Sequence, residues 1–309
     1  MILRVLGSAA GGGVPQWNCA CVNCAAARNG TAPRRTQSSL AVSADGERWL
    51  LLNCSPDVAV QIESFAPLQP RAGRGTPIAG MLLTDANVDH LGGLAVLRQG
   101  GGTGFTVRSS AVVREIALSQ TAFAPFAQPP HRWVDLALDA ACAPLDANDV
   151  AGTALEVRAL AVPGTTPGYD GRRSVRGAVV AYQIRDRGNR VLFAPVFGGV
   201  DAALREAIAA ADVAFLDGTF FSDDELVAGG FLPKRARALG HAPVGGDDGT
   251  LAMLRGVSTR MIFTHVNNTN PMLDPNSDAH ARMRDAGCEL AYDGMELRLG
   301  APGEAAARR

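Results

Sequence analysis

One loop constrains this chain more than any other segment, the run LLTDANVDHLGGL over residues 82–94. It begins at the end of an apolar stretch that reads as a strand, and His-Leu-Gly-Gly-Leu then opens a helix. Between the two lie four polar residues of kinds that hold metals or their substrates, namely Asp85, Asn87, Asp89 and His90. A strand, a polar loop and a helix in this order indicate an α/β fold with a metal-binding loop at a strand end.

Strand and helix patterns alternate along the rest of the chain. Strands are expected at Ile2–Leu6, Ser39–Val42, Trp49–Asn53, Ile78–Leu83, Phe105–Arg108, Leu155–Val162, Gly177–Arg185, Arg190–Ala194, Val213–Leu216 and Met261–Phe263. Helices are expected at Val58–Phe65, Gly92–Arg98, Val112–Phe123, Ala202–Ala210 and Thr250–Leu254. The second and third strands should form a hairpin around an Asp-Gly turn, and CELAYDGMELRL a second hairpin.

This order of elements predicts two similar layers of sheet faced by helices. We therefore expect one α/β domain over residues 1–300, an αββα sandwich of two mixed β-sheets, followed by a frayed tail at residues 301–309.

Charge and hydropathy exclude several classes of function. The net charge of −1 is spread along the chain, which argues against nucleic acid or an anionic membrane as a partner. No apolar run reaches the ~20 residues that a membrane span needs. The N-terminal MILRVLGSAAGGG is too short for a secretion signal and reads as a strand and a turn, so we expect a cytoplasmic protein. Its 6 cysteines should then be thiols or metal ligands.

Three of these cysteines, Cys19, Cys21 and Cys24, lie together in WNCACVNC. A CxCxxC knuckle after a Gly-rich turn can direct three thiolates at one zinc ion, so we expect a structural zinc site here rather than three unrelated thiols. Cys54, Cys288, a later His or Asn, or a group from another subunit could supply a fourth ligand. Because an exposed knuckle with three local ligands could join two subunits, we also expect a homodimer through or near it.

Polar residues also follow three later strands. Thr165 lies in the turn PGTTPG, Asp217 follows VAFL, and His265 precedes an amide-rich loop with Asn267 and Asn268. His241 stands just before a helix and could move a proton or orient a substrate. Taken singly, Asp89 could cap a helix, Asp217 could belong to a turn and His265 could be structural. Taken together, these strand-end residues predict a metal site at one edge of the sandwich.

The arrangement resembles the metallo-β-lactamase superfamily, whose loop reads His-x-His-x-Asp-His and whose fold is an αββα sandwich. At the first two histidine positions this chain has Asp85 and Asn87, and at the turn histidine it has Thr165. The positions of the other metal site are kept, with the ligands Asp89, His90, Asp217 and His265. The resemblance therefore implies one active-site metal in place of two.

Three longer segments resemble a narrower group, the PqqB family of pyrroloquinoline quinone (PQQ) biosynthesis. They are LGSAAGGGVPQWNCACVNC, LLTDANVDH and FTHVNNTNPML, and the likeness extends over essentially the whole chain. It implies action on a small-molecule PQQ precursor derived from linked Glu and Tyr. Two family roles follow: an iron- and O₂-dependent hydroxylation of the tyrosine-derived ring, or a carrier that helps PQQ or its precursor reach the periplasm.

Two imidazoles and one carboxylate favour the hydroxylase, because this ligand set leaves open positions on Fe(II). We expect His90, His265 and Asp89 to hold the iron, with Asp217 as a further ligand or a supporting group. The substrate should meet Asp85, Asn87, Thr165 and His241, and the loop of Asn268 should line the pocket or position His265. Other divalent metals could bind instead, and a mononuclear zinc hydrolase remains an alternative reading.

Overall fold

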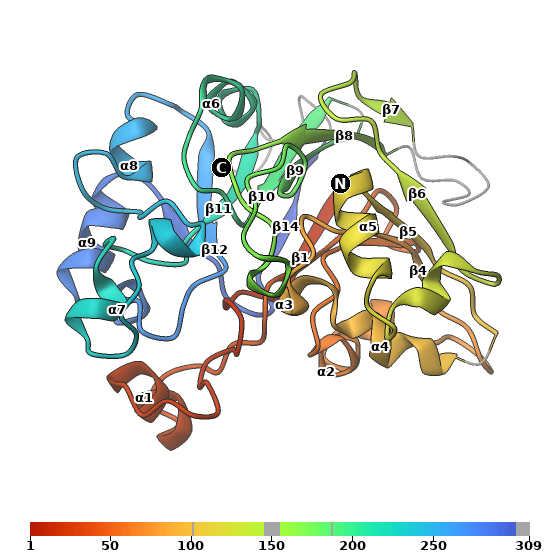
Figure 1. Ribbon diagram of the computed structural model, residues 1–309, viewed down its shortest axis with the longest axis horizontal. Helices are drawn as coiled ribbons and strands as arrows, with labels where there is room; N and C mark the ends of the chain where they lie inside the picture. The colour runs from red at the N-terminus through yellow and green to blue at the C-terminus, as the bar shows by residue number, and fades with distance from the viewer. Residues whose placement is uncertain (101, 145–154, 187, 301–309) are drawn as a thin grey trace.

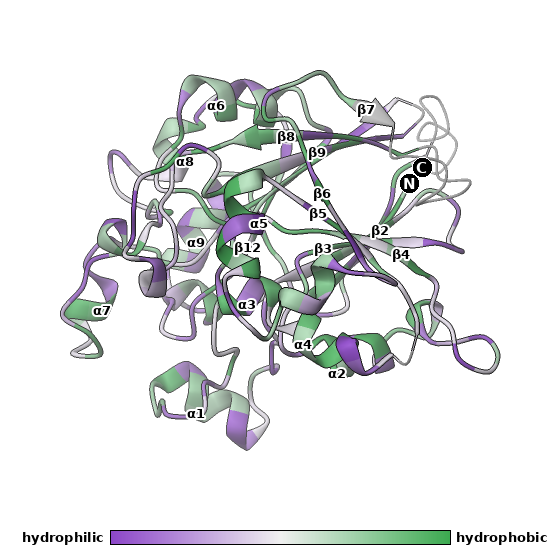
Figure 2. Cartoon of the chain, turned by 45° about the vertical axis from the view of Figure 1, so that its right-hand side comes forward, coloured by the Kyte–Doolittle hydropathy of each residue, from purple (hydrophilic) through white to green (hydrophobic). Residues whose placement is uncertain are grey.

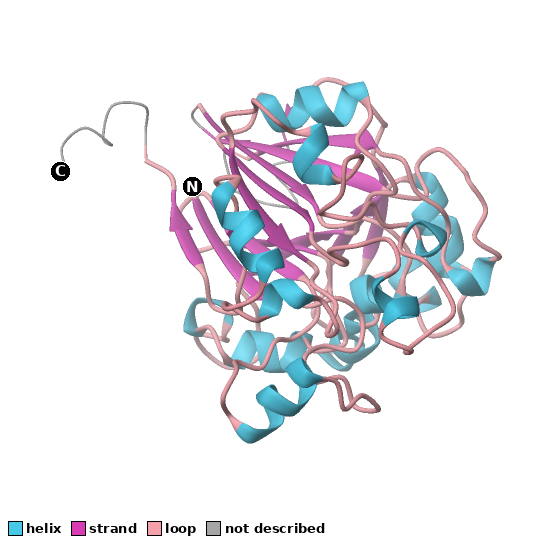
Figure 3. Cartoon of the chain, turned by 90° about the vertical axis from the view of Figure 1, so that its left-hand side faces the viewer, coloured by secondary structure: helices cyan, strands magenta, loops and turns pink. Residues whose placement is uncertain are grey.

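The computed structural model describes residues 1–100, 102–144, 155–186 and 188–300, and these form an αββα sandwich (Figure 1). Two sheets of 7 strands lie in the interior and the helices lie outside them, as Figure 3 shows. The expected fold class is thus confirmed. The expected frayed tail, residues 301–309, lies outside the described residues.

The first sheet has the strand order β14-β1-β2-β3-β4-β5-β6. Its strands are β1 (Ile2–Gly7), β2 (Ser39–Ser43), β3 (Trp49–Leu52), β4 (Ile78–Leu82), β5 (Thr106–Ser109), β6 (Arg132–Asp135) and β14 (Glu296–Arg298). The second sheet has the order β13-β12-β11-β10-β9-β8-β7. Its strands are β7 (Ala143–Pro144), β8 (Glu156–Ala161), β9 (Val180–Asp186), β10 (Asn189–Ala194), β11 (Val213–Asp217), β12 (Arg260–Thr264) and β13 (Glu289–Leu290).

The α-helices are α1 (Val22–Asn29), α2 (Val58–Glu63), α3 (Val88–Leu91), α4 (Gly93–Leu97), α5 (Ala111–Leu118), α6 (Ala202–Ala209), α7 (Glu225–Ala228), α8 (Thr250–Met253) and α9 (Asp278–Asp285). Short 3₁₀ helices lie at η1 (Ala66–Leu68), η2 (Arg98–Gly100), η3 (Ala124–Ala127), η4 (Gly168–Asp170), η5 (Arg237–Leu239) and η6 (Pro271–Leu273). Within the described residues, no helix is long and apolar enough to span a membrane.

Three apolar layers hold the sandwich together. Between the sheets, side chains such as Leu52 from the first sheet and Tyr182 and Phe215 from the second are fully buried. The outer face of the first sheet packs against α2 to α5, and the outer face of the second packs against α6 and α9. Strands covered on both faces must be apolar on both, which explains the near-continuous apolar runs in the sequence. Figure 2 shows these strands as largely hydrophobic.

The C-terminal hairpin prediction is wrong, because its two strands belong to different sheets. β13 pairs in parallel with β12, whereas β14 pairs antiparallel with β1. Asp293, between them, accepts hydrogen bonds from the backbone and hydroxyl of both Ser8 and Thr36. These bonds hold the Asp-Gly turn against the N-terminal segment, so the chain crosses between sheets here. The other predicted hairpin, β2–β3, is confirmed.

One buried hydroxyl forms a hydrogen bond between the two sheets, next to the metal-binding loop. Tyr182 in β9 is fully buried, and its hydroxyl donates a hydrogen bond of 2.7 Å to the carbonyl of Leu83, just after β4. The backbone N–H of Val180 donates to the carbonyl of Thr84 at 2.8 Å. These two bonds tie the end of β4 to the second sheet and so position the loop that follows.

Replacing Tyr182 with Phe should destabilise the fold by about 1–2 kcal/mol, because it leaves the buried Leu83 carbonyl without its donor. Urea unfolding followed by tryptophan fluorescence measures the change. Tyr292→Phe is the matched control, since Tyr292 is 52% exposed and should change stability little. Equal effects of the two variants would contradict this role for Tyr182.

Candidate metal centre

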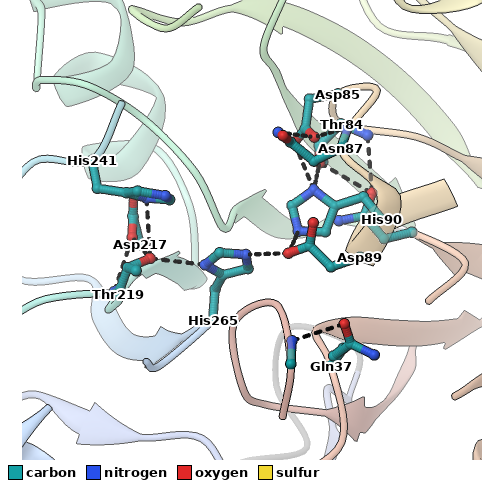
Figure 4. A network of polar contacts seen from close by, with 12 residues as sticks. Gln37, Thr84, Asp85, Asn87, Asp89, His90, Asp217, Thr219, His241 and His265 are labelled. Atoms are coloured by element: carbon teal, nitrogen blue, oxygen red, sulfur yellow. Dashed lines mark hydrogen bonds and ion pairs between the residues drawn. The ribbon is translucent and has the colours of Figure 1, made fainter. Parts of the chain in front are cut away.

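The polar residues predicted at strand ends meet at one edge of the sandwich (Figure 4). Asp89 and His90 lie in α3, after β4 of the first sheet, while Asp217 ends β11 and His265 follows β12 of the second. Because β11 and β12 run parallel, their carboxyl ends lie side by side. His265 has a φ of 56°, a left-handed conformation that is costly for a non-glycine residue and common at functional sites.

Asp89, His90 and His265 form a group of possible ligands whose ligand atoms all lie within 4.8 Å of one another. His265 Nε2 is 3.2 Å from Asp89 Oδ2, and His90 Nε2 is 3.7 Å from the same oxygen. His90 Nε2 is buried and has no hydrogen-bond partner among the described residues. A buried, unpaired nitrogen beside a carboxylate and a second imidazole fits a metal ion, so the residues present match the group that the sequence predicts.

Hydrogen bonds to its other nitrogen hold His90 in place. Its Nδ1 lies 2.6 Å from Asp85 Oδ2 and 3.2 Å from the hydroxyl of Thr84. An ionised carboxylate can only accept, so Nδ1 carries a proton and Nε2 faces the metal position. This arrangement corrects one prediction: Asp85 is fully buried and orients His90, so its carboxylate does not face a substrate.

Thr219 plays the same part for His265, and the sequence alone did not point to it. His265 Nδ1 lies 2.8 Å from the Thr219 hydroxyl, which in turn lies 2.6 Å from Asp217 Oδ1. The hydroxyl can accept from the imidazole while it donates to the carboxylate, which leaves His265 Nε2 directed at Asp89. Thr219 lies two residues after Asp217, which ends a strand. This position is the sequence feature that could have identified Thr219 as part of the site.

Asp217, His241 and His265 form a second group of possible ligands, which overlaps the first at His265. Asp217 is fully buried, and its Oδ2 accepts from the backbone of Phe197 at 3.0 Å and faces His241 Nδ1 at 2.8 Å. With Thr219 at Oδ1, both carboxylate oxygens are occupied. Asp217 therefore acts here as the support of His241 and Thr219, and His241 becomes a candidate fourth ligand or proton carrier.

The electrostatics of the centre favour a bound cation. Burial acts to raise the pKa of Asp89, but the charge of His90 and the contact with His265 outweigh it and hold that pKa well below its usual range. Burial also acts to lower the pKa of His90, yet Asp85 and Asp89 together raise it to about 9. Ionised carboxylates thus surround the site and make it strongly attractive to a metal.

The Gly-rich N-terminal turn approaches the same carboxylate. A Cβ atom placed on Gly11 would lie 3.2 Å from Asp89 Oδ2, closer than most real contacts of this kind. A side chain here would press against the proposed ligand. The glycine is thus explained by its place beside the metal centre, and it lines the cavity next to Ala10.

A cavity of about 330 Å³ opens beside the centre. Among the residues predicted to meet a substrate, Asn87, Thr165 and His241 line it. Asn268 does not, and the structure corrects its predicted place: the neighbouring Asn267 lines this cavity instead. Thr269 accepts from Asn267 and donates to Glu225, so a partly buried chain of hydrogen bonds holds the Asn267 amide at the cavity wall.

Asn268 belongs to the cysteine cluster. Cys19, Cys21 and Cys24 form a third group of possible metal ligands, and the Asn268 amide nitrogen lies 3.5 Å from the sulfur of Cys21 and 3.3 Å from that of Cys24. Two cysteines considered as a fourth ligand, Cys54 and Cys288, are buried in the outer apolar layers. Of the candidates within the described part of this chain, an Asn is thus the one that contacts the cluster, as a hydrogen-bond donor to two thiols.

Comparisons with known proteins agree with this fold. Residues 48–266 match the family model described as the beta-lactamase superfamily domain. The chain is 40% identical over 303 residues to the coenzyme PQQ synthesis protein B of Rhizobium meliloti, covering 96% of this chain and 97% of that protein. It is similar to the crystal structure of Zn²⁺-bound PqqB from Methylobacterium extorquens, with 36% identity, a TM-score of 0.89 and coverage of 97% and 100%. A diphosphatase of the PhnP family shares only the fold, with 19% identity, a TM-score of 0.67 and coverage of 97% and 98%.

The two sites should each hold a metal of their own. We expect His90→Ala to remove about one metal equivalent per chain from the edge site, and Cys24→Ser to remove about one from the cysteine cluster. Elemental analysis of dialysed protein measures both. His131→Ala is the control, since His131 stacks on Phe105 away from both groups. Full metal content in His90→Ala would contradict the proposed ligand set.

Proposed function

This chain belongs to the coenzyme PQQ synthesis protein B family, within the beta-lactamase superfamily, and we propose that its reaction in PQQ biosynthesis is an iron- and O₂-dependent hydroxylation. The substrate would be a tyrosine-derived ring in a small precursor. The observation that carries the proposal is the set of two imidazoles and one carboxylate, His90, His265 and Asp89, beside a cavity.

The other half of the pocket supports this choice. Asp85, Asn87 and Thr165 stand where the superfamily has the histidines of a second metal, and Asp85 is turned away to His90. A hydrolase that clamps a phosphoester between two ions needs both metals. With one metal held by Asp89, His90 and His265, the remaining space would be available to a substrate and to O₂. Fe(II) bound there would supply O₂ activation.

The chain's own residues would bind and orient the substrate. The side-chain amide of Asn87 donates an N–H to Asp85 at 2.8 Å, which leaves the side-chain carbonyl oxygen of Asn87 available at the cavity. Phe220, Val179 and Val196 give the cavity apolar walls suited to an aromatic ring. His241 is bonded through Nδ1 to Asp217, so its Nε2 is the nitrogen free to take or return a phenol proton.

A mononuclear zinc hydrolase is the second candidate, and the zinc in the related Methylobacterium extorquens structure favours it. The ligand set alone suits both metals. The two functions differ in their need for oxygen, and one assay separates them.

Protein loaded anaerobically with Fe(II) should hydroxylate a dihydroxyphenyl amino acid only after O₂ is added. Insertion of one oxygen atom into a C–H bond consumes two further electrons and two protons to reduce the second atom to water, so ascorbate is included. We expect His265→Ala to abolish the product and Thr219→Val to slow its formation by ~10–100-fold. Mass spectrometry with ¹⁸O₂ measures incorporation.

His280→Ala is the control, because His280 bonds to the Met272 carbonyl far from the ligand set. Absence of an O₂-dependent product in the iron-loaded parent protein would refute the hydroxylase. Oxygen-independent cleavage of esters or amides by the zinc form would favour the hydrolase.

We also propose a homodimer through the cysteine knuckle, and a cytoplasmic location in which its thiols stay reduced. α1 and the segment before it project from the body of the sandwich in Figures 1 and 2. Trp17 is 86% exposed and Val22 is 77% exposed, and exposed large apolar side chains that lie close together mark interaction surfaces. A second copy would cover them.

Analytical ultracentrifugation tests the dimer. We expect the parent protein to sediment as a dimer and Trp17→Ser to sediment as a monomer with unchanged metal content. A parent protein that sediments as a monomer at micromolar concentration, with both sites filled, would refute it.

A further inference from the structure

The turn that lacks the superfamily's histidine has gained two anchors across the cavity. It runs from Thr165 through η4 to Arg173, and the backbone of Thr166 and Arg173 closes it with a hydrogen bond of 2.9 Å. The hydroxyl of Tyr169 donates to the carbonyl of Ala86 in the metal-binding loop. On the other side, Arg172 Nη1 donates to the carbonyl of Leu239 at 3.1 Å. The turn is therefore held at both walls of the site.

Arg172 brings a permanent positive charge to this cavity. Among the described residues, it is the one arginine or lysine in the cavity lining. The neighbouring arginines have carboxylate partners: Arg173 pairs with Asp170, and Arg176 pairs with Asp139. Arg172 instead donates to a neutral carbonyl, that of Leu239. Within the part of the chain that the structure describes, this bond leaves most of its N–H donors available to a ligand.

Arg172 has a backbone conformation that is energetically unfavourable for a residue with a long side chain. Arg172 has a φ of 53°, directly after Gly171 with a φ of 82°. The left-handed region is uncommon for a long side chain and marks sites where the surrounding contacts determine the conformation. A Cβ placed on Gly168 would lie 3.5 Å from Arg172 Nη2, so the guanidinium lies along the glycine backbone.

The same turn also carries Thr165, which stands at the position of the superfamily's turn histidine, and both residues line the cavity. A Cβ on Gly240 would lie 3.6 Å from the Thr165 hydroxyl, while Arg172 bonds to the adjacent Leu239. The guanidinium and the residue that replaces the lost histidine ligand therefore both face the turn before His241. The carboxylate of Asp89 lines the same cavity.

We propose that Arg172 binds the carboxylate of the substrate. The inference rests on the proposed function and adds the residue that recognises the free carboxylate of a phenolic amino acid. The planar guanidinium can donate two parallel N–H bonds to such a group. The carboxylate then lies at Thr165 and Arg172, and the ring extends past Val179 and Phe220 toward the metal ligands.

Calorimetric binding to the anaerobic, zinc-loaded protein tests this assignment without turnover. The probes are 3,4-dihydroxyphenylalanine and its carboxamide, which differ in the carboxylate alone. We expect the parent protein to prefer the acid, and Arg172→Met to weaken binding of the acid by about 10–100-fold while leaving the amide unchanged. Arg172→Lys should restore only part of the preference, because an ammonium cannot donate in the fork geometry.

Arg173→Met is the matched control, since it removes an equal charge from the adjacent residue, which does not line the cavity. It should keep the preference for the acid. Equal weakening of both probes in Arg172→Met would assign the residue to anchoring the turn and overturn the proposal. A parent protein with no preference for the acid, or no binding of either probe, would also overturn it. Because no O₂ is present, failure of the hydroxylation assay leaves this result unaffected.

Discussion

The contact between Asp89 and His265 is the interaction on which the rest of the site depends. It joins residues 176 positions apart in sequence, one from the first sheet and one from the second. Burying a carboxylate and several imidazoles together is costly unless opposite charge and hydrogen bonds compensate. Here the apolar layers bring the sheets together, and Tyr182 fixes their relation directly below the loop. The candidate metal centre thus lies at the edge of the sandwich, where the apolar contact between the two sheets gives way to polar side chains.

Each imidazole at the centre is held through its second nitrogen. His90 is held by Asp85, His265 by Thr219 and His241 by Asp217. The three Nε2 atoms are therefore oriented without a bound ion, which lowers the free-energy cost of ordering the ligands when a metal binds. Asp85 illustrates the difference from the two-metal superfamily. There this position holds a metal ligand, whereas in this chain Asp85 orients the proposed ligand His90.

The cysteine cluster is coupled to the catalytic edge through one loop. Asn23 in α1 donates to the carbonyls of Asn268 and Asn270 at 2.9 and 3.0 Å. The side-chain amide of Asn268 donates to the sulfur of Cys24. Asn270 in turn donates to the carbonyls of Gly218 and Thr219, next to the support of His265. A metal in the cluster would therefore stiffen the loop that follows His265. The amide-rich segment is explained by this linkage more than by contact with a substrate.

The sequence by itself determined the fold class, the strand ends and the residue types at them, because period, turn chemistry and ligand spacing are local properties of a chain. It identified Asp89, His90, His265 and the three clustered cysteines without any coordinates. It could not decide which face of the metal-binding loop Asp85 occupies, since a carboxylate serves equally as ligand, substrate contact or support. Nor could it show that CELAYDGMELRL divides between two sheets, or that Thr219 and Arg172 reach the site. Those outcomes depend on contacts between segments distant in sequence, and only tertiary packing sets them.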